Sequence, residues 1–147
     1  MNKPILLVED DENEVFLFTR ALKRAGLETP PLIVSDGQQA VDYIDGTGKF
    51  ADRLQFPFPY LVLLDLKLPR IKGLDVLKHI RAVHGSRPTV VILSSSRNAA
   101  DVAGAYALGA NAYLAKPTDY ESLVRMAGSI LDFWLNYNVV SSLGPLA

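Results

Sequence analysis

The chain has 147 residues, of which 49% are apolar, and this is enough for one compact core and one domain. Its formal net charge of −1 predicts no nucleic-acid partner, and the absence of cysteine excludes disulfides, thiolate chemistry and cysteine-ligated metal sites. The first apolar run turns acidic at Glu9 and no run approaches the roughly 18 apolar residues of a membrane span, so we expect a cytoplasmic protein with neither a signal peptide nor a membrane partner.

Five short apolar runs predict β-strands. They are rich in Val, Ile and Leu and mostly continuous, which is typical of strands buried on both faces by helices. In chain order the predicted strands are Ile5–Val8, Leu32–Val34, Tyr60–Leu64, Thr89–Leu93 and Ala112–Leu114.

Amphipathic stretches after these strands predict five helices. The first opens with Asp11 and Glu14 and the last with Thr118 and Glu121, each pair in the spacing of a capping box. The predicted helices cover residues 11–25, 36 to the DGTG at 45–48, 73–83, 98–108 and 118–134.

The strict alternation of strands and helices predicts parallel strands joined by right-handed crossovers. A closed barrel needs more such units than this chain has, so we expect an α/β fold with an open, doubly wound, five-stranded parallel sheet. Residues 1–136 are expected to form this domain, and residues 137–147 a C-terminal tail.

Polar residues follow four of the predicted strands at their carboxyl ends, where open α/β sheets bind ligands. They are Glu9 and Asp10, Asp65, Ser94–Ser96 and Lys116. Taken one at a time, the first acids are equally well explained by the start of a helix, the serines by a turn and the lysine by a solvated loop. Asp65 is harder to explain in this way, because burying a carboxylate without partners costs several kcal/mol. The set therefore indicates one polar site.

Carboxylate oxygens suit a hard divalent cation, and Mg²⁺ tolerates a partly hydrated site of this kind. His79 and His84 lie on and just beyond the third predicted helix, away from this edge, so zinc is not expected here. A carboxylate beside Mg²⁺, a hydroxyl and a lysine can accept a phosphoryl group, because the cations neutralise the charge on its oxygens. The resulting acyl phosphate is labile and reversible, which suits a switch.

Four motifs, LLVEDD, LLDLKLP followed by KGLDVL, VVILSSS and GANAYLAKP, together resemble the receiver domains of two-component response regulators. The resemblance covers about residues 3–134. It implies a flavodoxin-like (βα)5 fold with strand order 2-1-3-4-5. It also implies that Asp65 accepts a phosphoryl group from a histidine kinase's phosphohistidine, and that Glu9, Asp10, Asp65 and the backbone carbonyl of Lys67 hold Mg²⁺.

The same resemblance assigns the phosphoryl-binding and switch residues. Ser94 and Lys116 would bind the phosphoryl oxygens, and Tyr113 would be the aromatic side chain whose rotamer reports the switch. A plain strand aromatic packed in place remains an alternative for Tyr113. The Lys116–Pro117 bond would be a cis peptide.

The long segment at residues 45–60 and the ending DFWLNYN resemble stand-alone receivers that partner bacterial phytochromes. The expected donor is therefore a sensor histidine kinase, such as a bacterial phytochrome, or a phosphotransfer protein. The chain ends soon after the fifth helix, so we expect output through another protein or through self-association. We expect no enzymatic activity beyond the chain's own phosphorylation and dephosphorylation.

Two other functions share part of this pattern. A haloacid-dehalogenase-type phosphatase also uses an aspartyl nucleophile, but it needs a second acid two residues later, where this chain has Lys67, and no cap domain is present. A degenerate receiver would act only as a binding module, and the intact Asp10, Asp65 and Lys116 argue against it.

The fifth predicted helix carries more apolar residues than one face can bury. Leu123, Met126, Ile130 and Trp134 form its inward stripe, and further apolar residues follow. We expect a homodimer through the C-terminal helix, and the alternative is a tail folded back on its own domain. The candidate contact residues are Phe133, Trp134, Leu135 and Tyr137.

Overall fold

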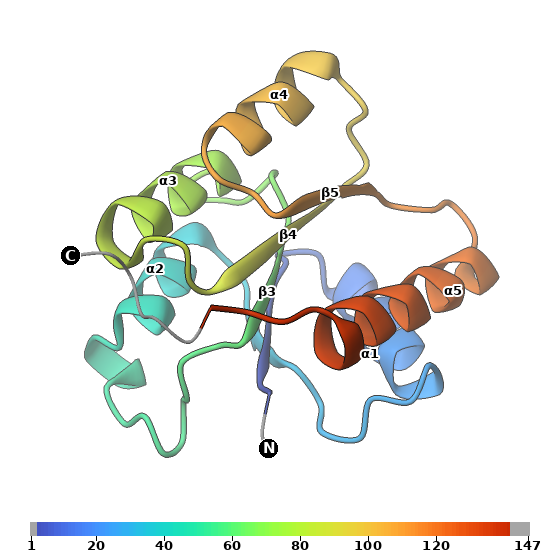
Figure 1. The fold of residues 1–147 in the computed structure, drawn as a ribbon, viewed down its shortest axis with the longest axis horizontal. Helices are drawn as coiled ribbons and strands as arrows, with labels where there is room; N and C mark the ends of the chain where they lie inside the picture. Colours follow the sequence, from blue (N-terminus) through green and yellow to red (C-terminus); the bar gives the residue numbers. More distant parts are fainter. Residues whose placement is uncertain (1–2, 142–147) are drawn as a thin grey trace.

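The computed structural model describes residues 3–141 and shows strands and helices in strict alternation (Figure 1). The strands are β1 (Ile5–Val8), β2 (Leu32–Val34), β3 (Leu61–Leu64), β4 (Thr89–Ser94) and β5 (Ala112–Ala115). The helices are α1 (Glu12–Arg24), α2 (Gly37–Asp45), α3 (Gly73–His84), α4 (Ala99–Ala107) and α5 (Tyr120–Ile130). A 3₁₀ turn, η1 (Gly48–Phe50), follows α2, and a π-helical segment, η2 (Leu131–Tyr137), continues α5.

All five strands form one parallel sheet in the order β2-β1-β3-β4-β5, which confirms the predicted topology. Helices α1 and α5 cover one face, and α2, α3 and α4 cover the other (Figure 1). The direction of winding changes between β1 and β3, which lie side by side. Their carboxyl ends therefore mark the switch point at which ligands bind in such sheets.

The central strand β3 supplies both halves of the core, because successive side chains of a strand point to opposite faces. Leu61 and Leu63 pack beneath α1 and α5, while Val62 and Leu64 pack beneath the three helices of the other face. All four are fully buried. This two-sided burial explains why the strand sequence is continuously apolar.

The helix starts differ in part from the sequence prediction. Asp11 caps α1, accepting from the backbone N–H groups two and three residues on at 2.8 and 3.2 Å. Glu14 does not complete a capping box, because its carboxylate turns towards the strand ends. The predicted cap of α5 at Thr118 is wrong: Asp119 is the N-cap and accepts from Ser122 N at 2.8 Å. Asp is the better of these two neighbouring caps.

The long segment between α2 and β3 is tied to the end of α2 by one guanidinium. Arg53 donates to the backbone carbonyls of Tyr43, Ile44 and Phe56, at 2.7, 2.6 and 3.1 Å. The rings of Tyr43, Phe50 and Phe56 pack together with centroids 5.1–6.0 Å apart. Phe50 and Phe56 therefore anchor this mostly exposed segment to the core. No helix within residues 3–141 is long and apolar enough to cross a bilayer.

The two histidines of α3 share the carboxylate of Asp45, the last residue of α2. His79 Nε2 lies 2.8 Å from Asp45 Oδ2, and His84 Nε2 lies 2.7 Å from Asp45 Oδ1. Burial raises the pKa of the Asp45 carboxyl, but the hydrogen bonds with His84 and His79 outweigh it, so this pKa lies below its ordinary value. The ionised carboxylate therefore contributes to the stability of the folded protein.

Replacing Asp45 with asparagine is expected to lower the free energy of unfolding at pH 6 by about 1–2 kcal/mol. A carboxyl whose pKa is lowered by folding stabilises the protein above its unfolded pKa, and this contribution is lost as the pH falls through the folded pKa. The difference between wild type and Asp45→Asn should thus shrink below a pH of about 4. Urea unfolding at a series of pH values measures it, with the exposed Glu28→Gln as the control. A difference that does not depend on pH would contradict this prediction.

Candidate phosphoacceptor and metal site

Three carboxylates converge where β1 and β3 end. Val8 and Leu64 are paired in the sheet, so Glu9 and Asp65, which follow them, emerge at the same edge. Glu9, Asp10 and Asp65 each offer an oxygen within 4.8 Å of the others. Glu9 and Asp65 are 4% and 7% exposed, and Asp10 is exposed, so the cluster is open to solvent on one side only.

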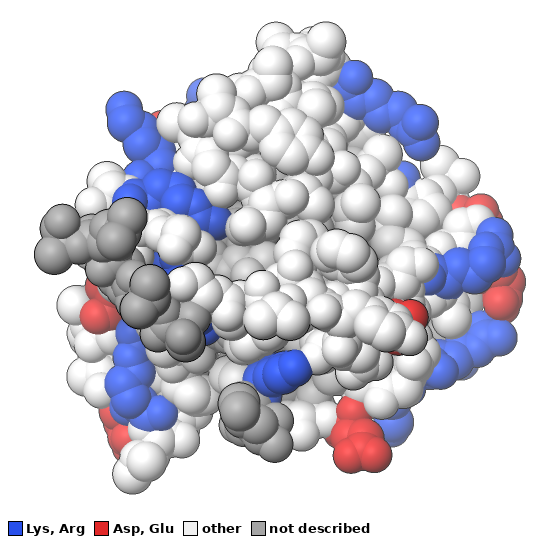
Figure 2. Space-filling model, in the orientation of Figure 1, with Lys and Arg blue, Asp and Glu red and all other residues white. Residues whose placement is uncertain are grey.

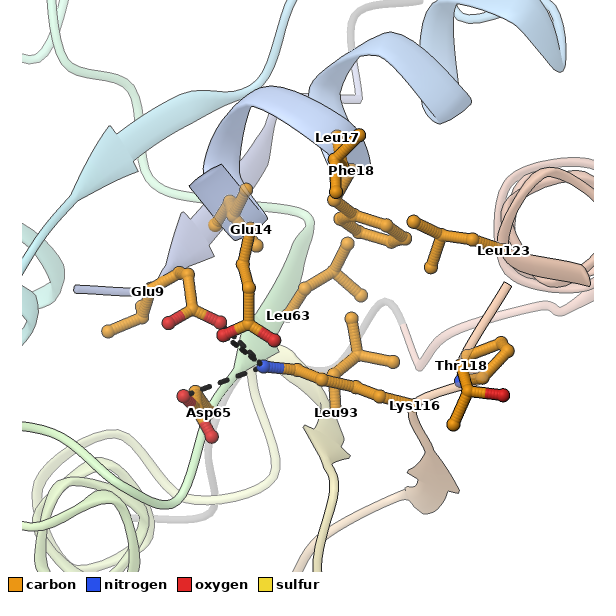
Figure 3. A pocket seen from close by; sticks show the side chains of 13 residues that line it. Glu9, Glu14, Leu17, Phe18, Leu63, Asp65, Leu93, Lys116, Thr118 and Leu123 are labelled. Carbon is orange, nitrogen blue, oxygen red and sulfur yellow. Dashed lines mark hydrogen bonds and ion pairs between the residues drawn. The ribbon is translucent and has the colours of Figure 1, made fainter. Parts of the chain in front are cut away.

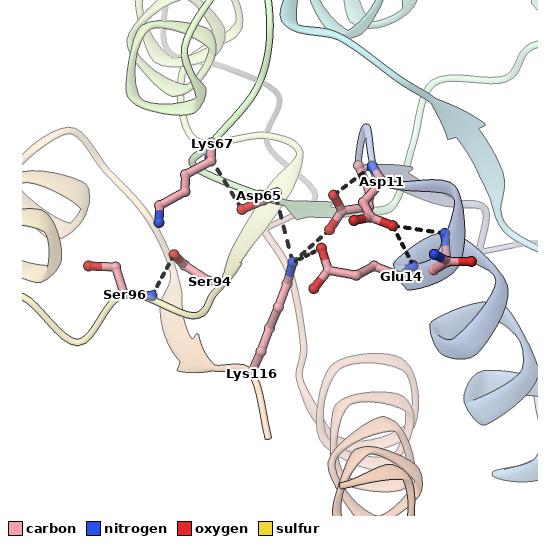
Figure 4. Close-up of polar contacts among 9 residues, drawn as sticks. Asp11, Glu14, Asp65, Lys67, Ser94, Ser96 and Lys116 are labelled. Atoms are coloured by element: carbon pink, nitrogen blue, oxygen red, sulfur yellow. Dashed lines mark hydrogen bonds and ion pairs between the residues drawn. The ribbon is translucent and has the colours of Figure 1, made fainter. Parts of the chain in front are cut away.

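The buried carboxylate of Asp65 has partners on both oxygens. Lys67 N donates to Asp65 Oδ1 at 3.3 Å, and the ammonium of Lys116 lies 3.6 Å from Oδ2 (Figure 4). The start of α3 lies against its backbone: a Cβ on Gly73 would fall 2.5 Å from the carbonyl oxygen of Asp65. These contacts explain how a charge can stand at the end of a fully buried strand.

Lys116, which directly follows β5, reaches three carboxylates with one ammonium (Figures 3 and 4). Its Nζ lies 2.6 Å from Glu9 Oε1, 3.2 Å from Glu14 Oε2 and 3.6 Å from Asp65 Oδ2. Burial lowers the pKa of Lys116, but the hydrogen bond with Glu9 and the surrounding negative charges outweigh it, so the pKa is raised. The ammonium is therefore a fixed positive charge in an otherwise acidic site.

Ser94 is the last residue of β4, as predicted, and Tyr113 is the second residue of the neighbouring strand β5. Ser94 is fully buried, and its Oγ accepts from Ser96 N at 3.1 Å. The hydroxyl of Tyr113 donates to the carbonyl of Ser96 at 2.8 Å, and its ring packs partly buried against the core. Ser96, in the loop after β4, is thus hydrogen-bonded to both Ser94 and Tyr113. The side chain of Lys67 points towards this loop (Figure 4).

The prediction of a cis peptide at Lys116–Pro117 is not borne out. Within residues 3–141, the cis peptide of the structure is Arg87–Pro88. The two isomers of an X–Pro bond differ intrinsically by only about 0.5–1 kcal/mol, so the surrounding structure, which the local sequence does not show, decides between them.

Two site residues were missed by the sequence analysis. Glu14 was assigned to a helix cap, although the first turn of α1 follows directly on the end of β1 and so faces the same edge. For Gly73 the sequence predicts only the start of a helix, because the close approach of this residue to Asp65 depends on the tertiary structure. The one signal for Glu14 in the sequence was its position four residues after Asp10, in the first turn of the helix that follows β1.

The donor set fits a hard divalent cation. Three carboxylate oxygens lie within 4.8 Å of one another, no histidine or cysteine within residues 3–141 joins them, and the exposed Asp10 leaves one side of the cluster open for water ligands. Lys67 lies two residues after Asp65 and donates its backbone N–H to the Asp65 carboxylate. A bound divalent cation would supply positive charge to the oxygens of a phosphoryl group on Asp65.

Residues 5–127 match the family described as the response regulator receiver domain. The response regulator Rcp1 of Synechocystis sp. is 36% identical over 134 residues, which cover 90% of this chain and 89% of Rcp1. The probable methanogenesis regulatory protein FilR2 of Methanothrix harundinacea is 36% identical over 138 residues, which cover 91% of this chain and 84% of FilR2. This chain therefore belongs to the response regulator receiver family.

Solved structures agree over nearly the whole chain. The response regulator RPA3017, in red light signalling of R. palustris, has 37% identity and a TM-score of 0.86, covering 95% of this chain and 99% of its own. The phosphorylated cyanobacterial phytochrome response regulator RcpA has 34% identity and a TM-score of 0.85, covering 97% and 100%. The Mn²⁺-bound form of Rcp1 has 34% identity and a TM-score of 0.85, covering 96% and 100%. The expected receiver fold is confirmed.

Proposed function

We propose that this chain is a stand-alone response regulator that accepts a phosphoryl group on Asp65 in a Mg²⁺-dependent reaction. The observation that carries the proposal is the buried Asp65 carboxylate, which forms part of the acidic cluster and lies 3.6 Å from the ammonium of Lys116. Labelling by acetyl phosphate, lost on removal of Mg²⁺ or of the Asp65 carboxylate, tests it. In this proposal the chain catalyses only its own phosphorylation and dephosphorylation.

The proposed transfer is a displacement at phosphorus. A carboxylate oxygen of Asp65 forms the new O–P bond while the N–P bond of the donor's phosphohistidine breaks, and the released imidazole nitrogen takes up a proton. Lys116 and Ser94 are proposed to bind the phosphoryl oxygens, and Glu9, Asp10, Asp65 and the Lys67 carbonyl to hold Mg²⁺. The acid that a haloacid-dehalogenase-type phosphatase needs two residues after its nucleophile is replaced by Lys67, which disfavours that alternative.

The switch is proposed to act through the loop that already connects Ser94 and Tyr113. A phosphoryl group that draws Ser94 inward would move Ser96, and with it the acceptor of the Tyr113 hydroxyl. Only such a differential interaction with the phosphoryl group can shift the equilibrium between two conformations. The surface formed by α4, β5 and α5 would then carry the output to a partner.

The donor is proposed to be a sensor histidine kinase of the bacterial phytochrome kind, directly or through a phosphotransfer protein. The support is that RPA3017 belongs to red light signalling and RcpA is a phytochrome response regulator, and both align with nearly all of this chain. FilR2, a probable methanogenesis regulatory protein, is 36% identical to this chain, so a sensor kinase outside the phytochromes is the second candidate donor. The rate of phosphotransfer to this chain, measured with a kinase of each class, distinguishes the two candidate donors.

A homodimer through the C-terminal segment is also proposed. Phe133 and Tyr137 are 52% and 71% exposed on η2, and Val139 is 90% exposed. The candidates Trp134 and Leu135 pack instead against the chain's own core. They would therefore support the proposed dimer surface from beneath rather than contact the second subunit. Figure 2 shows charged side chains mostly towards the rim of this face and few at its centre, over β5 and the segment after α5.

The alternative of a tail folded back on its own domain also has support. Arg87 Nη1 donates to the carbonyl of Ser141 at 2.9 Å, and Lys3 Nζ donates to the carbonyl of Leu135. The predicted tail, residues 137–147, lies within the described residues only to 141. Folding back anchors the segment and still leaves the side chains of Phe133 and Tyr137 exposed.

Replacing Phe133 with glutamate is expected to convert the dimer to a monomer at micromolar concentration. Burying a large apolar side chain contributes about 1.5–3 kcal/mol, and a charge in its place must be desolvated in each subunit. Light scattering after size exclusion measures the mass. Phe16→Glu replaces a similarly exposed aromatic, 61% against 52%, in the second turn of α1 and should remain dimeric. A monomeric wild type, with and without beryllofluoride, or a dimeric Phe133→Glu would discard this interface.

A further inference from the structure

The ammonium of Lys116 is closer to two other carboxylates than to the proposed acceptor. It lies 2.6 Å from Glu9 and 3.2 Å from Glu14, against 3.6 Å from Asp65. Glu14 projects from the first turn of α1 into a cavity of about 220 Å³ that Asp65 and Lys116 also line (Figure 3).

Glu9 and Glu14 differ in what else they can bind. Glu9 belongs to the cluster of convergent carboxylates and is the proposed ligand of a metal ion. Glu14 does not belong to that cluster; among the described residues its carboxylate hydrogen-bonds the Lys116 ammonium and also lies against the carboxylate of Glu9. Glu14 is therefore the carboxylate that can keep hold of the ammonium when Glu9 is committed elsewhere.

An ammonium has three N–H donors, and those turned to Glu9 and Glu14 are not available to other oxygens. A phosphoryl group on Asp65 needs donors from Lys116, so the ammonium must give up contacts that it makes in the unphosphorylated protein. A contact that exists only in the unphosphorylated conformation stabilises that conformation. It therefore lowers the apparent affinity for a ligand that binds better to the phosphorylated one. The contact with Glu14 is of this kind.

We propose that Glu14 is a positioning residue that holds Lys116 in the unphosphorylated protein and competes with the phosphoryl group for it. This inference rests on the proposed function, because it assigns Lys116 to the phosphoryl oxygens. The strength of the contact between Glu14 and Lys116 thereby sets the free energy that the phosphoryl group must supply to move the ammonium to Asp65.

The test is the affinity for beryllofluoride, an analogue of the phosphoryl group, measured by calorimetry in saturating Mg²⁺. Glu14→Gln removes the competing charge and keeps the side-chain shape, and the affinity should rise about fivefold, the size expected for a partly exposed ion pair. Glu12→Gln removes the same charge from an exposed position in the same helical turn and should leave the affinity unchanged. Unchanged or weaker binding by Glu14→Gln would overturn the inference.

A double-mutant cycle separates competition for Lys116 from simple repulsion between Glu14 and the bound anion. In a Lys116→Met background, Glu14→Gln should no longer change the affinity, and an equal gain in both backgrounds would overturn the inference. A second readout needs no ligand: the ¹⁵N signal of the Lys116 ammonium should shift in Glu14→Gln and not in Glu12→Gln. An unmoved signal would also overturn it.

Failure of the proposed function has a different signature. If wild type does not bind beryllofluoride, or Asp65→Asn binds it as tightly as wild type does, the phosphoacceptor assignment is wrong and this inference falls with it. If wild type binds, Asp65→Asn does not, and Glu14→Gln behaves as wild type, only the role of Glu14 is refuted.

Discussion

Replacing Asp65 with asparagine is expected to reduce labelling by acetyl phosphate to background. A carboxamide lacks the anionic oxygen that attacks phosphorus, and the neighbouring Glu9 and Asp10 belong to the proposed metal site. Wild type should be labelled in Mg²⁺ and unlabelled after EDTA, with labelling restored by added Mg²⁺. Intact mass spectrometry measures the occupied fraction, and the label should be an acyl phosphate, stable in neither strong acid nor base.

Loss of labelling in Asp65→Asn should not come from unfolding. Lys116 keeps its contacts with Glu9 and Glu14, at 2.6 and 3.2 Å, and one of several crowded negative charges is removed. The free energy of unfolding should therefore be equal to that of wild type or higher by up to about 1 kcal/mol. Asp11→Asn is the control, because asparagine caps a helix as well as aspartate does and labelling should persist. Labelling of Asp65→Asn would show that another residue is the acceptor.

Replacing Gly73 with alanine is expected to damage both the fold and the site. The new Cβ would lie 2.5 Å from the carbonyl oxygen of Asp65 and 2.6 Å from Leu66 Cα, and these backbone atoms cannot move without displacing β3 or α3. The start of α3 is also held there by Gly73 N, which donates to the Leu66 carbonyl at 3.1 Å. We expect the free energy of unfolding to fall by about 3 kcal/mol. We also expect slower labelling, because the acceptor carboxylate moves with its backbone.

Urea unfolding and acetyl phosphate labelling measure the two effects of Gly73→Ala. Gly104→Ala in α4 is the matched control, since its new Cβ meets nothing closer than Leu74 Cδ1 at 3.7 Å. An alanine inside a helix should raise the free energy of unfolding there by about 0.5–1 kcal/mol. If Gly73→Ala were as stable as wild type and labelled at the same rate, the close approach of α3 to Asp65 would not constrain the site.

The sequence alone predicted the sheet and the convergence of acidic residues and Lys116 at one edge of it. The bounds of β1 and β2 were predicted without error, and the other strands to within one residue. Burial on both faces makes such strands continuously apolar, so their position is a local property of the sequence. The parallel arrangement then brings their carboxyl ends to one edge, which is why the sequence alone predicts that Glu9, Asp65 and Lys116 lie close together.

The tertiary structure alone decided the contacts between distant segments. Glu14 has the spacing of a capping box, yet an ammonium 102 residues further along the chain draws it into the site. The fifth helix continues as a π-helix, whose i→i+5 bonding departs from the period on which the sequence prediction of inward and outward faces depended. Leu135 consequently packs inward while Phe133 stays exposed. Local sequence determines which residues are buried in a strand and which residues cap a helix. Which charges and helix faces come into contact depends on the free energy of interaction between distant segments, and no local pattern records it.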